Sequence, residues 1–355
     1  MQQSEAMYDV AVVGQGIAGS LLSWFLKQAG MKVLVIDESH MGSSSAVAAG
    51  IVNPVTGKSF VPSWNIGLFL PFALKTYREM ESNLGISLVK EVNIIRSLYS
   101  IQDENTWFAR SDDPVVGMYI RDRADVSEFE GKVRPPYSYG ETQGTFQVDL
   151  ALLMENLKIK WLSSGNYLES KFDHNSLEFR DEGFYYQGIK FRKVVFCEGY
   201  RAKENKFFPG LGMGPSKGEV LLVKIPGANF RKMYKDQIFI VHQYNDIYWV
   251  GSGYQWNAPD DLPTPAIRQK LESQLSAILT IPYEVVGHKA AIRPTMHTRR
   301  PIFAEHSEYK GMYLFNGLGT KGTSIGPLAA FQISDYLAGV SDFPPLFAAL
   351  SRVQG

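Results

Sequence analysis

The chain has 355 residues, 45% of them hydrophobic and 20% charged, with 36 Lys and Arg against 36 Asp and Glu and one cysteine, Cys197. At about 150 residues per domain, the length predicts two domains. One cysteine excludes an intrachain disulfide framework and a cysteine-only metal site, and zero net charge gives no overall reason to expect a nucleic-acid or anionic-membrane partner. The first seven residues show no signal-peptide pattern and no apolar run is long enough for a membrane span, so we expect a cytoplasmic protein.

The first predicted elements form a strand–helix–strand unit. Residues 8–13 (YDVAVV) are a short β-branched run that ends in glycine, which predicts a buried strand. From residue 18 to 29 the apolar positions follow one helical stripe, and Gly30 supplies a C-terminal stop. Residues 32–36 (KVLVI) predict a second buried strand. Two strands joined by a helix within about 30 residues are typical of a parallel sheet.

Further along the chain, patterns typical of parallel and antiparallel sheets alternate. Helices are predicted at residues 66–82, 146–157, 266–279 and 323–337, and strands at 193–197, 218–225, 237–242, 247–251 and 312–316. The buried strands typical of a parallel sheet lie at both ends and in the middle, with antiparallel patterns between them. We therefore predict an α/β fold in which two domains are interleaved along the chain.

The turn after the first strand carries the motif Gly14-Gln15-Gly16-Ile17-Ala18-Gly19. Between a strand and a helix, these glycines allow a tight turn, a close approach to a pyrophosphate and close packing of helix on sheet. Backbone N–H groups of Ile17 and Ala18 lie at the helix N-terminus, which attracts phosphates. Asp37 follows the second strand, where a carboxylate accepts hydrogen bonds from ribose hydroxyls. The motif predicts a dinucleotide site but does not separate FAD from NAD.

Four short segments, in order and spacing, resemble the superfamily of D-amino-acid oxidase and glycine oxidase, which are FAD-dependent. They are the glycine motif through Asp37; Gly42–Ser45 with Ala48–Ile51; Val194–Gly199 with Pro215–Val220; and Ile292–Thr295 with Gly317–Gly322 and Gly326–Ala330. Asn53-Pro54 and the GLGTKG turn are most similar to the oxidase domain of the bifunctional enzyme that modifies wobble uridine in tRNA.

The resemblance implies a Rossmann-like FAD-binding domain, formed by residues 1–85, 140–215 and 290–355. A substrate domain built on a mostly antiparallel sheet would comprise 86–139 and 216–289. FAD would be bound non-covalently, because Val47 stands where relatives with attached flavin have histidine. The implied FAD-binding residues are Gly14, Gly16, Ile17, Ala18, Gly19, Asp37, Ser44, Ser45, Ala49, Gly50, Gly199, Gly317, Gly319, Thr320, Lys321 and Gly322.

Arg293 is the candidate catalytic residue, because a guanidinium grips a carboxylate through two parallel hydrogen bonds. Relatives hold the substrate carboxylate with this arginine, although here Thr298 replaces an expected acid and Arg299-Arg300 adds charge. We expect oxidation of the C–N bond of an amino acid or N-substituted glycine to an imine that hydrolyses, with a small-molecule amine as partner. His288, His297 and His306 lack metal-ligand spacing with cysteine or carboxylates, so no metal is expected.

Two alternatives stay open from the sequence. The first is oxidative removal of a carboxymethyl group from a modified wobble uridine in tRNA, against which the balanced charge counts, since RNA binding usually needs a basic surface. The second is a flavin-binding protein whose catalytic site has decayed, suggested only by Thr298. Lys321 has two interpretations from the sequence: it adds positive charge to the turn, or it faces water.

Overall fold

A parallel sheet forms the centre of the first of two structural units. In the computed structural model, which describes residues 7–39, 42–180, 183–214, 216–256, 260–344 and 346–347, unit 1 comprises residues 1–46, 150–216 and 292–355. Unit 2 comprises residues 47–149 and 217–291. Each unit draws on segments far apart in the sequence, as the alternation of sheet patterns predicted.

The predicted strand–helix–strand segment lies in the middle of unit 1. Strand β1 (Tyr8–Val13) pairs in parallel with β2 (Val33–Asp37) and with β13 (Ile189–Phe196). Parallel strands β10 (Tyr167–Glu169) and β20 (Met312–Asn316) complete the order β10-β2-β1-β13-β20. The remaining strands are antiparallel additions: β19 (Ile302–Glu305) on β20, and β12 (Gly183–Tyr186) with β11 (Glu178–Arg180) on β13.

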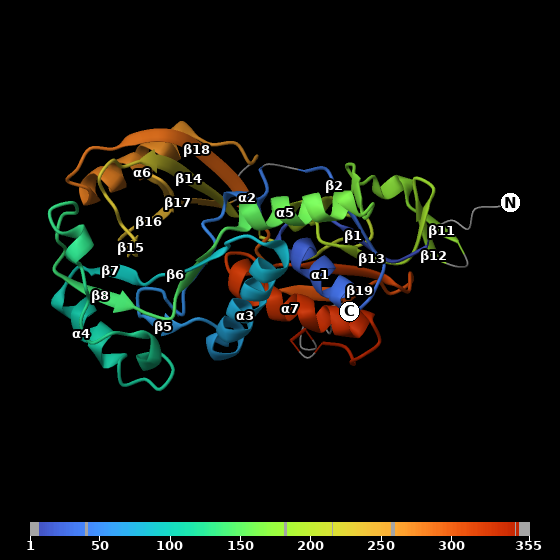
Figure 1. Ribbon diagram of the computed structural model, residues 1–355, viewed down its shortest axis with the longest axis horizontal. Helices are drawn as coiled ribbons and strands as arrows, with labels where there is room; N and C mark the ends of the chain where they lie inside the picture. The colour runs from blue at the N-terminus through green and yellow to red at the C-terminus, as the bar shows by residue number, and fades with distance from the viewer. Residues whose placement is uncertain are drawn as a thin grey trace. The chain divides into compact units, whose positions relative to one another are not determined.

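Two helices that follow parallel strands lie side by side in unit 1. Helix α1 (Ile17–Gln28) follows β1 and α7 (Gly322–Leu337) follows β20, and Figure 1 shows them in contact. A Cβ atom built on Gly326 of α7 would lie 2.8 Å from the Leu21 side chain of α1, so glycine there permits the close approach. Because β1 and β20 run parallel, both helices begin at the carboxyl edge of the sheet. A third helix, α5 (Leu150–Ser163), also contacts α1.

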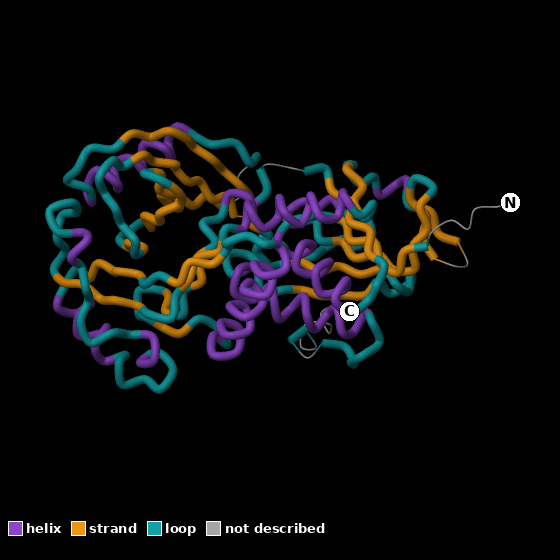
Figure 2. The backbone as a smooth tube through the Cα atoms, viewed as in Figure 1, coloured by secondary structure: helices purple, strands orange, loops and turns teal. Residues whose placement is uncertain are grey.

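Unit 2 is built on a seven-stranded, mostly antiparallel sheet. Figure 2 draws the strands of the chain in orange. In spatial order its strands are β18 (Glu284–Arg293), β14 (Ser216–Lys224), β17 (Ile247–Trp256), β16 (Phe239–Tyr244), β15 (Met233–Lys235), β7 (Ile94–Leu98) and β8 (Ser138–Thr142). The β15–β7 pair is parallel. One face of this sheet is covered by α6 (Pro265–Ile278).

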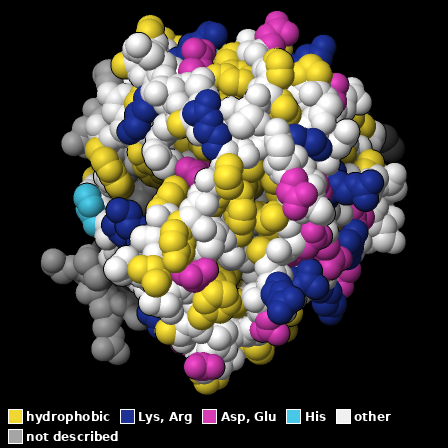
Figure 3. Space-filling model, turned by 90° about the vertical axis from the view of Figure 1, so that its left-hand side faces the viewer, with side chains coloured by type: hydrophobic (Ala, Val, Ile, Leu, Met, Phe, Trp, Pro, Cys, Tyr) yellow, Lys and Arg dark blue, Asp and Glu magenta, His cyan; other side chains and the backbone are white. Residues whose placement is uncertain are grey.

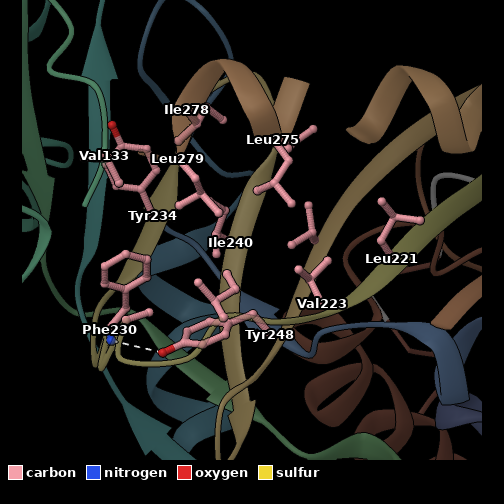
Figure 4. Packing of buried hydrophobic residues seen from close by; sticks show 14 of the residues in the cluster. Val133, Leu221, Val223, Phe230, Tyr234, Ile240, Tyr248, Leu275, Ile278 and Leu279 are labelled. Carbon is pink, nitrogen blue, oxygen red and sulfur yellow. Dashed lines mark hydrogen bonds between the residues drawn. The ribbon is translucent and has the colours of Figure 1, made fainter. Parts of the chain in front are cut away.

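The core under α6 is apolar, and the Tyr248 hydroxyl inside it is hydrogen-bonded. Figure 4 shows Leu275 and Ile278 of α6 among Val223, Ile240 and other strand residues. Within this core the Tyr248 hydroxyl accepts a hydrogen bond of 3.1 Å from the backbone N–H of Phe230. Burying a tyrosine costs little when its hydroxyl is paired.

Unit 2 also contains smaller elements, and the division of the chain between residues 46 and 47 falls within one of them, α2. They are α2 (Ser44–Val47), α3 (Ile66–Leu84), α4 (Ile101–Ala109), the sheet of β3 (Ile51–Val52), β9 (Phe146–Val148) and β6 (Val89–Glu91), and the hairpin of β4 (Val55–Thr56) and β5 (Val61–Pro62). Short 3₁₀ helices occur at Gly117–Tyr119 and Ser127–Phe129, and in unit 1 at His174–Ser176 and Gly199–Glu204. Among the helices of the described residues, none is both long and apolar enough to cross a membrane.

The structure corrects one predicted element and moves the unit boundaries. The helix predicted at 146–157 is wrong at its start, because residues 146–148 form β9 between β3 and β6 and the helix begins at Leu150. Residues 47–85 and 140–149, assigned from the sequence to the nucleotide-binding part, lie in unit 2. Strands in these residues pair with other strands of that unit. Pairing between segments far apart in the chain produces no local sequence pattern, so the sequence does not indicate these boundaries. The mixed fold class, with parallel and antiparallel sheets, is confirmed.

Candidate active site

Unit 1 contains a cavity of about 530 Å³ at the carboxyl edge of its parallel sheet. Its lining comes from the turn after β1, the end of β2, the turn after β13 and the turn after β20. Ligands in open parallel sheets bind at this edge, where the loops that connect strands to helices meet. Of the predicted cofactor-binding residues, those on the lining are Gly14, Gly16, Ile17, Ala18, Asp37, Ser44, Ser45, Gly199 and Gly319.

Glycine stands at the three motif positions for different structural reasons. A Cβ on Gly14, whose φ is +99°, would lie 2.5 Å from the Cys197 carbonyl oxygen, and one on Gly19 would lie 1.8 Å from the Gly14 carbonyl oxygen. Both positions therefore exclude a side chain through backbone contacts. A Cβ on Gly16 would meet only the Ser45 Oγ, at 3.4 Å, so this glycine keeps open the space in front of α1. Without a side chain at that position, a ligand can approach the helix N-terminus closely.

Ser45 connects the small-residue loop to the glycine turn. Its Oγ accepts a hydrogen bond of 2.9 Å from the backbone N–H of Ile17, the first residue of α1. Ser44 begins the short helix α2 and also lines the cavity. Thus a hydroxyl stands beside the N-terminal N–H groups of α1, which favour an anion through their aligned dipoles.

Asp37 holds the glycine turn in place from the end of β2. Its carboxylate accepts hydrogen bonds from the backbone N–H groups of Gln15, at 2.7 Å, and Ser39, at 2.6 Å, and its Oδ1 lies 3.4 Å from the Tyr167 hydroxyl. An ionised carboxylate offers about four acceptor positions, so capacity remains for a ribose hydroxyl. The adjacent Glu38 forms an ion pair with Arg201, and both line the cavity.

The turn after β20 is tied to the turn after β13. The Asn316 side chain donates a 2.7 Å hydrogen bond to the Gly199 carbonyl and accepts one of 2.8 Å from the Gly317 N–H. Leu318 and Gly319 line the cavity, and the Gly319 N–H donates to the Pro294 carbonyl at 3.3 Å. Asn316 was missed from the sequence, although a buried amide at the end of an apolar strand is a signal that could have identified it.

The N-termini of the two adjacent helices meet beside this cavity. A Cβ on Gly322, the first residue of α7, would lie 3.1 Å from Ile17 Cγ2 at the start of α1. Lys321 is half-buried just before α7, and burial lowers the pKa of its ammonium group to about 8. Lys321 therefore does not simply face water. Two helix N-termini and a desolvated lysine favour negative charge on this side of the cavity.

Several predicted residues lie away from the cavity lining. Thr320 is exposed in the turn, and Ala49 and Gly50 belong to unit 2. Gly50 has a φ of +68°, and a Cβ there would lie 1.8 Å from the Val148 carbonyl oxygen, which explains the glycine without a ligand. Packing also explains the glycine at position 317, because a Cβ built on Gly317 would lie 2.5 Å from the Met296 side chain.

Arg293 is the last residue of β18 and is half-buried. It directly precedes Pro294, which lines the cavity, and its carbonyl accepts a 2.9 Å hydrogen bond from the Thr295 N–H. The segment after β18 thus has an internal hydrogen bond, and the Pro294 carbonyl joins it by a hydrogen bond to the turn after β20. This places the Arg293 backbone next to the end of the cavity that Leu318 and Gly319 form.

A second polar group on the lining was not recognised from the sequence. His174 Nε2 lies 2.7 Å from Glu198 Oε1, and Asn205 donates a 2.8 Å hydrogen bond to Glu198 Oε2. Glu198 interrupts the apolar run VVFC before Gly199, which was an available signal. Both oxygens of this carboxylate therefore have fixed partners at the side of the cavity where β13 ends.

The residues present fit the nucleotide part of FAD. Two glycines form a backbone turn that no side chain could occupy, Gly16 leaves the N-terminus of α1 open, and Asp37 retains acceptor capacity beside it. The cavity has the volume typical of cofactor and ligand pockets. Among the described residues no group of three His, Cys, Asp or Glu side chains could hold a metal ion.

Solved structures with the same fold span the chain. Glycine oxidase from Geobacillus kaustophilus matches with a TM-score of 0.80 and 18% identity, over 98% of this chain and 99% of that one. L-amino acid deaminase from Proteus vulgaris matches with a TM-score of 0.78 and 16% identity over 100% of both chains. Iminodiacetate oxidase from Chelativorans sp. BNC1 matches with a TM-score of 0.77 and 18% identity, over 96% and 98%.

The family comparison covers most of the sequence. The model of the DAO family, described as FAD dependent oxidoreductase, matches residues 9–336. This range includes the glycine turn, Asp37, Arg293 and the turn before α7. The cavity, the glycine turn and the family match lead to one conclusion: the chain belongs to the DAO family of FAD-dependent oxidoreductases.

Proposed function

We propose that this enzyme oxidises the C–N bond of an amino acid or N-substituted glycine, giving an imine that hydrolyses. The observation that carries the proposal is the continuity of the cavity lining. It extends from the glycine turn to Pro294 and Gly319, directly beside Arg293. A cofactor site that ends next to a half-buried arginine suits a substrate whose carboxylate must be held near the reacting carbon.

Arg293 would bind and orient the substrate carboxylate. A guanidinium offers two parallel N–H donors, so it fixes the plane of the carboxylate as well as its position. Positioning of this kind lowers the barrier by several kcal/mol, because the reacting atoms no longer have to find one another. Asp37, Ser45 and the N-termini of α1 and α7 would hold the cofactor.

The reaction needs little acid–base chemistry from the protein. Bound FAD supplies an acceptor for a hydride from the carbon attached to the amine nitrogen. As that C–H bond breaks, the nitrogen lone pair forms the C=N bond, and water then adds to the imine to release the carbonyl product and an amine or ammonia. The substrate amine must be neutral for this step. The chain's part is to orient the carbon and exclude competing water.

The groups at the start of α7 support an electron-accepting site. The N-terminus of α7 and the ammonium group of Lys321 favour negative charge in their vicinity. Because Lys321 is partly removed from water, its charge is screened less than that of an exposed lysine. We infer that Lys321 contributes to the affinity for the anionic cofactor.

The tRNA alternative shares the carboxylate but needs a larger surface. A carboxymethyl group on a modified uridine would also suit Arg293, whereas the rest of the RNA calls for exposed cations. On the face shown in Figure 3, basic and acidic side chains lie interspersed. Of the three cations Arg299, Arg300 and Lys321, only Arg299 is exposed, and the other two are half-buried. These observations favour the small-molecule substrate.

The decisive experiment is an anaerobic screen with FAD-loaded protein. Each amine is added without oxygen, and bleaching of the flavin absorbance reports oxidation. The panel contains amino acids of both configurations, N-alkyl glycines, the amides of the same compounds, and carboxymethylated uridine nucleosides. Bleaching by a carboxylate-bearing amine but not by its amide supports the proposal. Bleaching only by the nucleosides, or by none of the compounds, refutes it.

A further inference from the structure

An ion pair in unit 1 joins the ends of two strands that are not neighbours. Glu38 directly follows β2, and Arg201 lies in the short 3₁₀ helix Gly199–Glu204 after β13. Their side chains form a salt bridge, and both residues line the cavity. Strand β1 lies between β2 and β13 and runs parallel to both. The link therefore spans two strand spacings, about 10 Å, across the carboxyl end of β1.

The glycine turn begins at this end of β1. Gly14 directly follows β1, and a Cβ atom built on it would lie 2.5 Å from the Cys197 carbonyl oxygen, at the start of the turn that leads to Arg201. A dinucleotide bound here would extend from Asp37 along the glycine turn, and that route passes the gap between the ends of β2 and β13. The ion pair spans the same gap. It therefore lies across the path by which such a cofactor reaches the glycine turn.

The backbone on both sides of the pair is held in place, so opening the pair requires side-chain rotation alone. Ala202, next to Arg201, is fully buried. On the other side, the Asp37 carboxylate accepts a 2.6 Å hydrogen bond from the Ser39 N–H, which fixes the backbone before and after Glu38. Glutamate and arginine have long side chains that change rotamer rapidly where they are exposed. The pair can thus break and re-form without moving either strand.

We propose that the Glu38–Arg201 pair is a clasp over the nucleotide cavity, which must open before FAD enters or leaves. The pair lies at the entrance, because 33% of the Arg201 side chain and 28% of the Glu38 side chain are exposed although both residues line the cavity. Ion pairs with this exposure are weak, so the clasp slows FAD exchange without preventing it. This role concerns the cofactor and does not depend on which amine is oxidised.

Attraction of the anionic cofactor by charge is the competing explanation. Glu38 repels FAD and Arg201 attracts it, so attraction alone predicts faster association without the acid and slower association without the cation. A clasp predicts a different result, because the loss of either partner opens it. Variants that remove or exchange both charges together keep the net charge, and they therefore separate the two explanations.

The first test variant is Glu38→Met/Arg201→Met, which cannot form the ion pair. Association is followed by the change in flavin fluorescence when FAD is mixed with the apoprotein, and dissociation by dilution of the FAD-loaded protein. We expect both rate constants to rise about two- to fivefold, which corresponds to about 0.4 to 1 kcal/mol, the strength of an exposed pair. The dissociation constant should stay the same, because opening a clasp raises both rates alike.

The second test variant, Glu38→Arg/Arg201→Glu, restores the pair with its charges exchanged and should exchange FAD at the wild-type rate. The matched control removes an exposed ion pair of the same residue types, Glu178 and Arg180 of β11, which lies outside the described lining of the cavity. Glu178→Met/Arg180→Met should also exchange FAD like the wild type. Melting midpoints of the apoproteins check that all variants fold.

Salt supplies a second readout that needs no substitution. A high salt concentration screens an exposed ion pair, so it should speed FAD exchange more in the wild type and in the charge-exchanged variant than in the double methionine variant. An equal response of all three proteins would overturn the clasp.

Three further results would overturn it. In the first, the double methionine variant exchanges FAD at the wild-type rate. In the second, only its dissociation is faster, which would make the two residues ordinary contacts of bound FAD. In the third, the charge-exchanged variant is as fast as the double methionine variant, so that the ion pair itself plays no part. Because no amine is added, failure of the proposed function leaves these outcomes unchanged.

Discussion

The hydroxyl of Ser45 accepts a 2.9 Å hydrogen bond from the backbone N–H of Ile17 and so joins two segments 28 residues apart at the N-terminus of α1. Both residues line the cavity. We expect Ser45→Ala to weaken FAD binding by about fivefold, since one net hydrogen bond contributes about 1 kcal/mol. Fluorescence titration of FAD into apoprotein measures the change. Ser163→Ala, at the exposed end of α5, is the control and should bind FAD like the wild type. Equal affinity of Ser45→Ala and wild type would contradict the role.

Replacing different motif glycines should have different effects: one replacement should reduce stability and the other should reduce FAD binding. Gly19→Ala places a methyl group 1.8 Å from a backbone oxygen, so we expect a loss of about 3 kcal/mol or more in unfolding free energy. Gly16→Ala meets only a side-chain oxygen at 3.4 Å and should keep the apoprotein midpoint while binding FAD at least about tenfold more weakly. Apoprotein melting and FAD titration check both. A Gly16→Ala variant with normal FAD affinity would show that no group approaches this position closely.

The pKa of Lys321 predicts pH-dependent cofactor binding. Burial lowers that pKa to about 8, so the lysine loses its charge as the pH rises through about 8. An anion bound nearby favours the charged form, so FAD affinity should be highest below pH 8 and decline above it. Lys321→Met should flatten the profile between pH 7 and 9. Lys27→Met, which removes a lysine at the end of α1 whose pKa is also lowered by burial, should leave the decline in place.

Arg293 should tolerate lysine poorly. Lysine keeps the charge but loses the planar fork, so one of two charge-assisted hydrogen bonds disappears. We expect kcat/KM for carboxylate substrates to fall by about 10- to 150-fold, from a loss of about 1.5 to 3 kcal/mol. Activity on the matching amides should change little. Steady-state kinetics with acid and amide pairs would measure this, and equal losses on both would show that Arg293 only supports the fold.

Local sequence determined the first βαβ segment almost completely. The strand at 8–13 was predicted to the residue, and the helix and second strand within one or two residues. Their hydrophobic periodicity and the glycine turn depend on neighbours in the chain, which a single sequence displays. The same reasoning located α7 and the turn before it. The choice of FAD came from resemblance over short segments, and the family match agrees with it.

Tertiary structure alone decided which distant segments meet. Residues 146–148 alternate too briefly to indicate a strand, and they become β9 because β3 and β6 pair with them. Arg96 and Lys235 lie 139 positions apart, and only the parallel pairing of β7 with β15 makes them neighbours. The contact of Ser45 with Ile17 and the ties of Asn316 arise in the same way. Hydrogen bonds and buried contacts between remote segments form only when the chain packs, so no local periodicity encodes them.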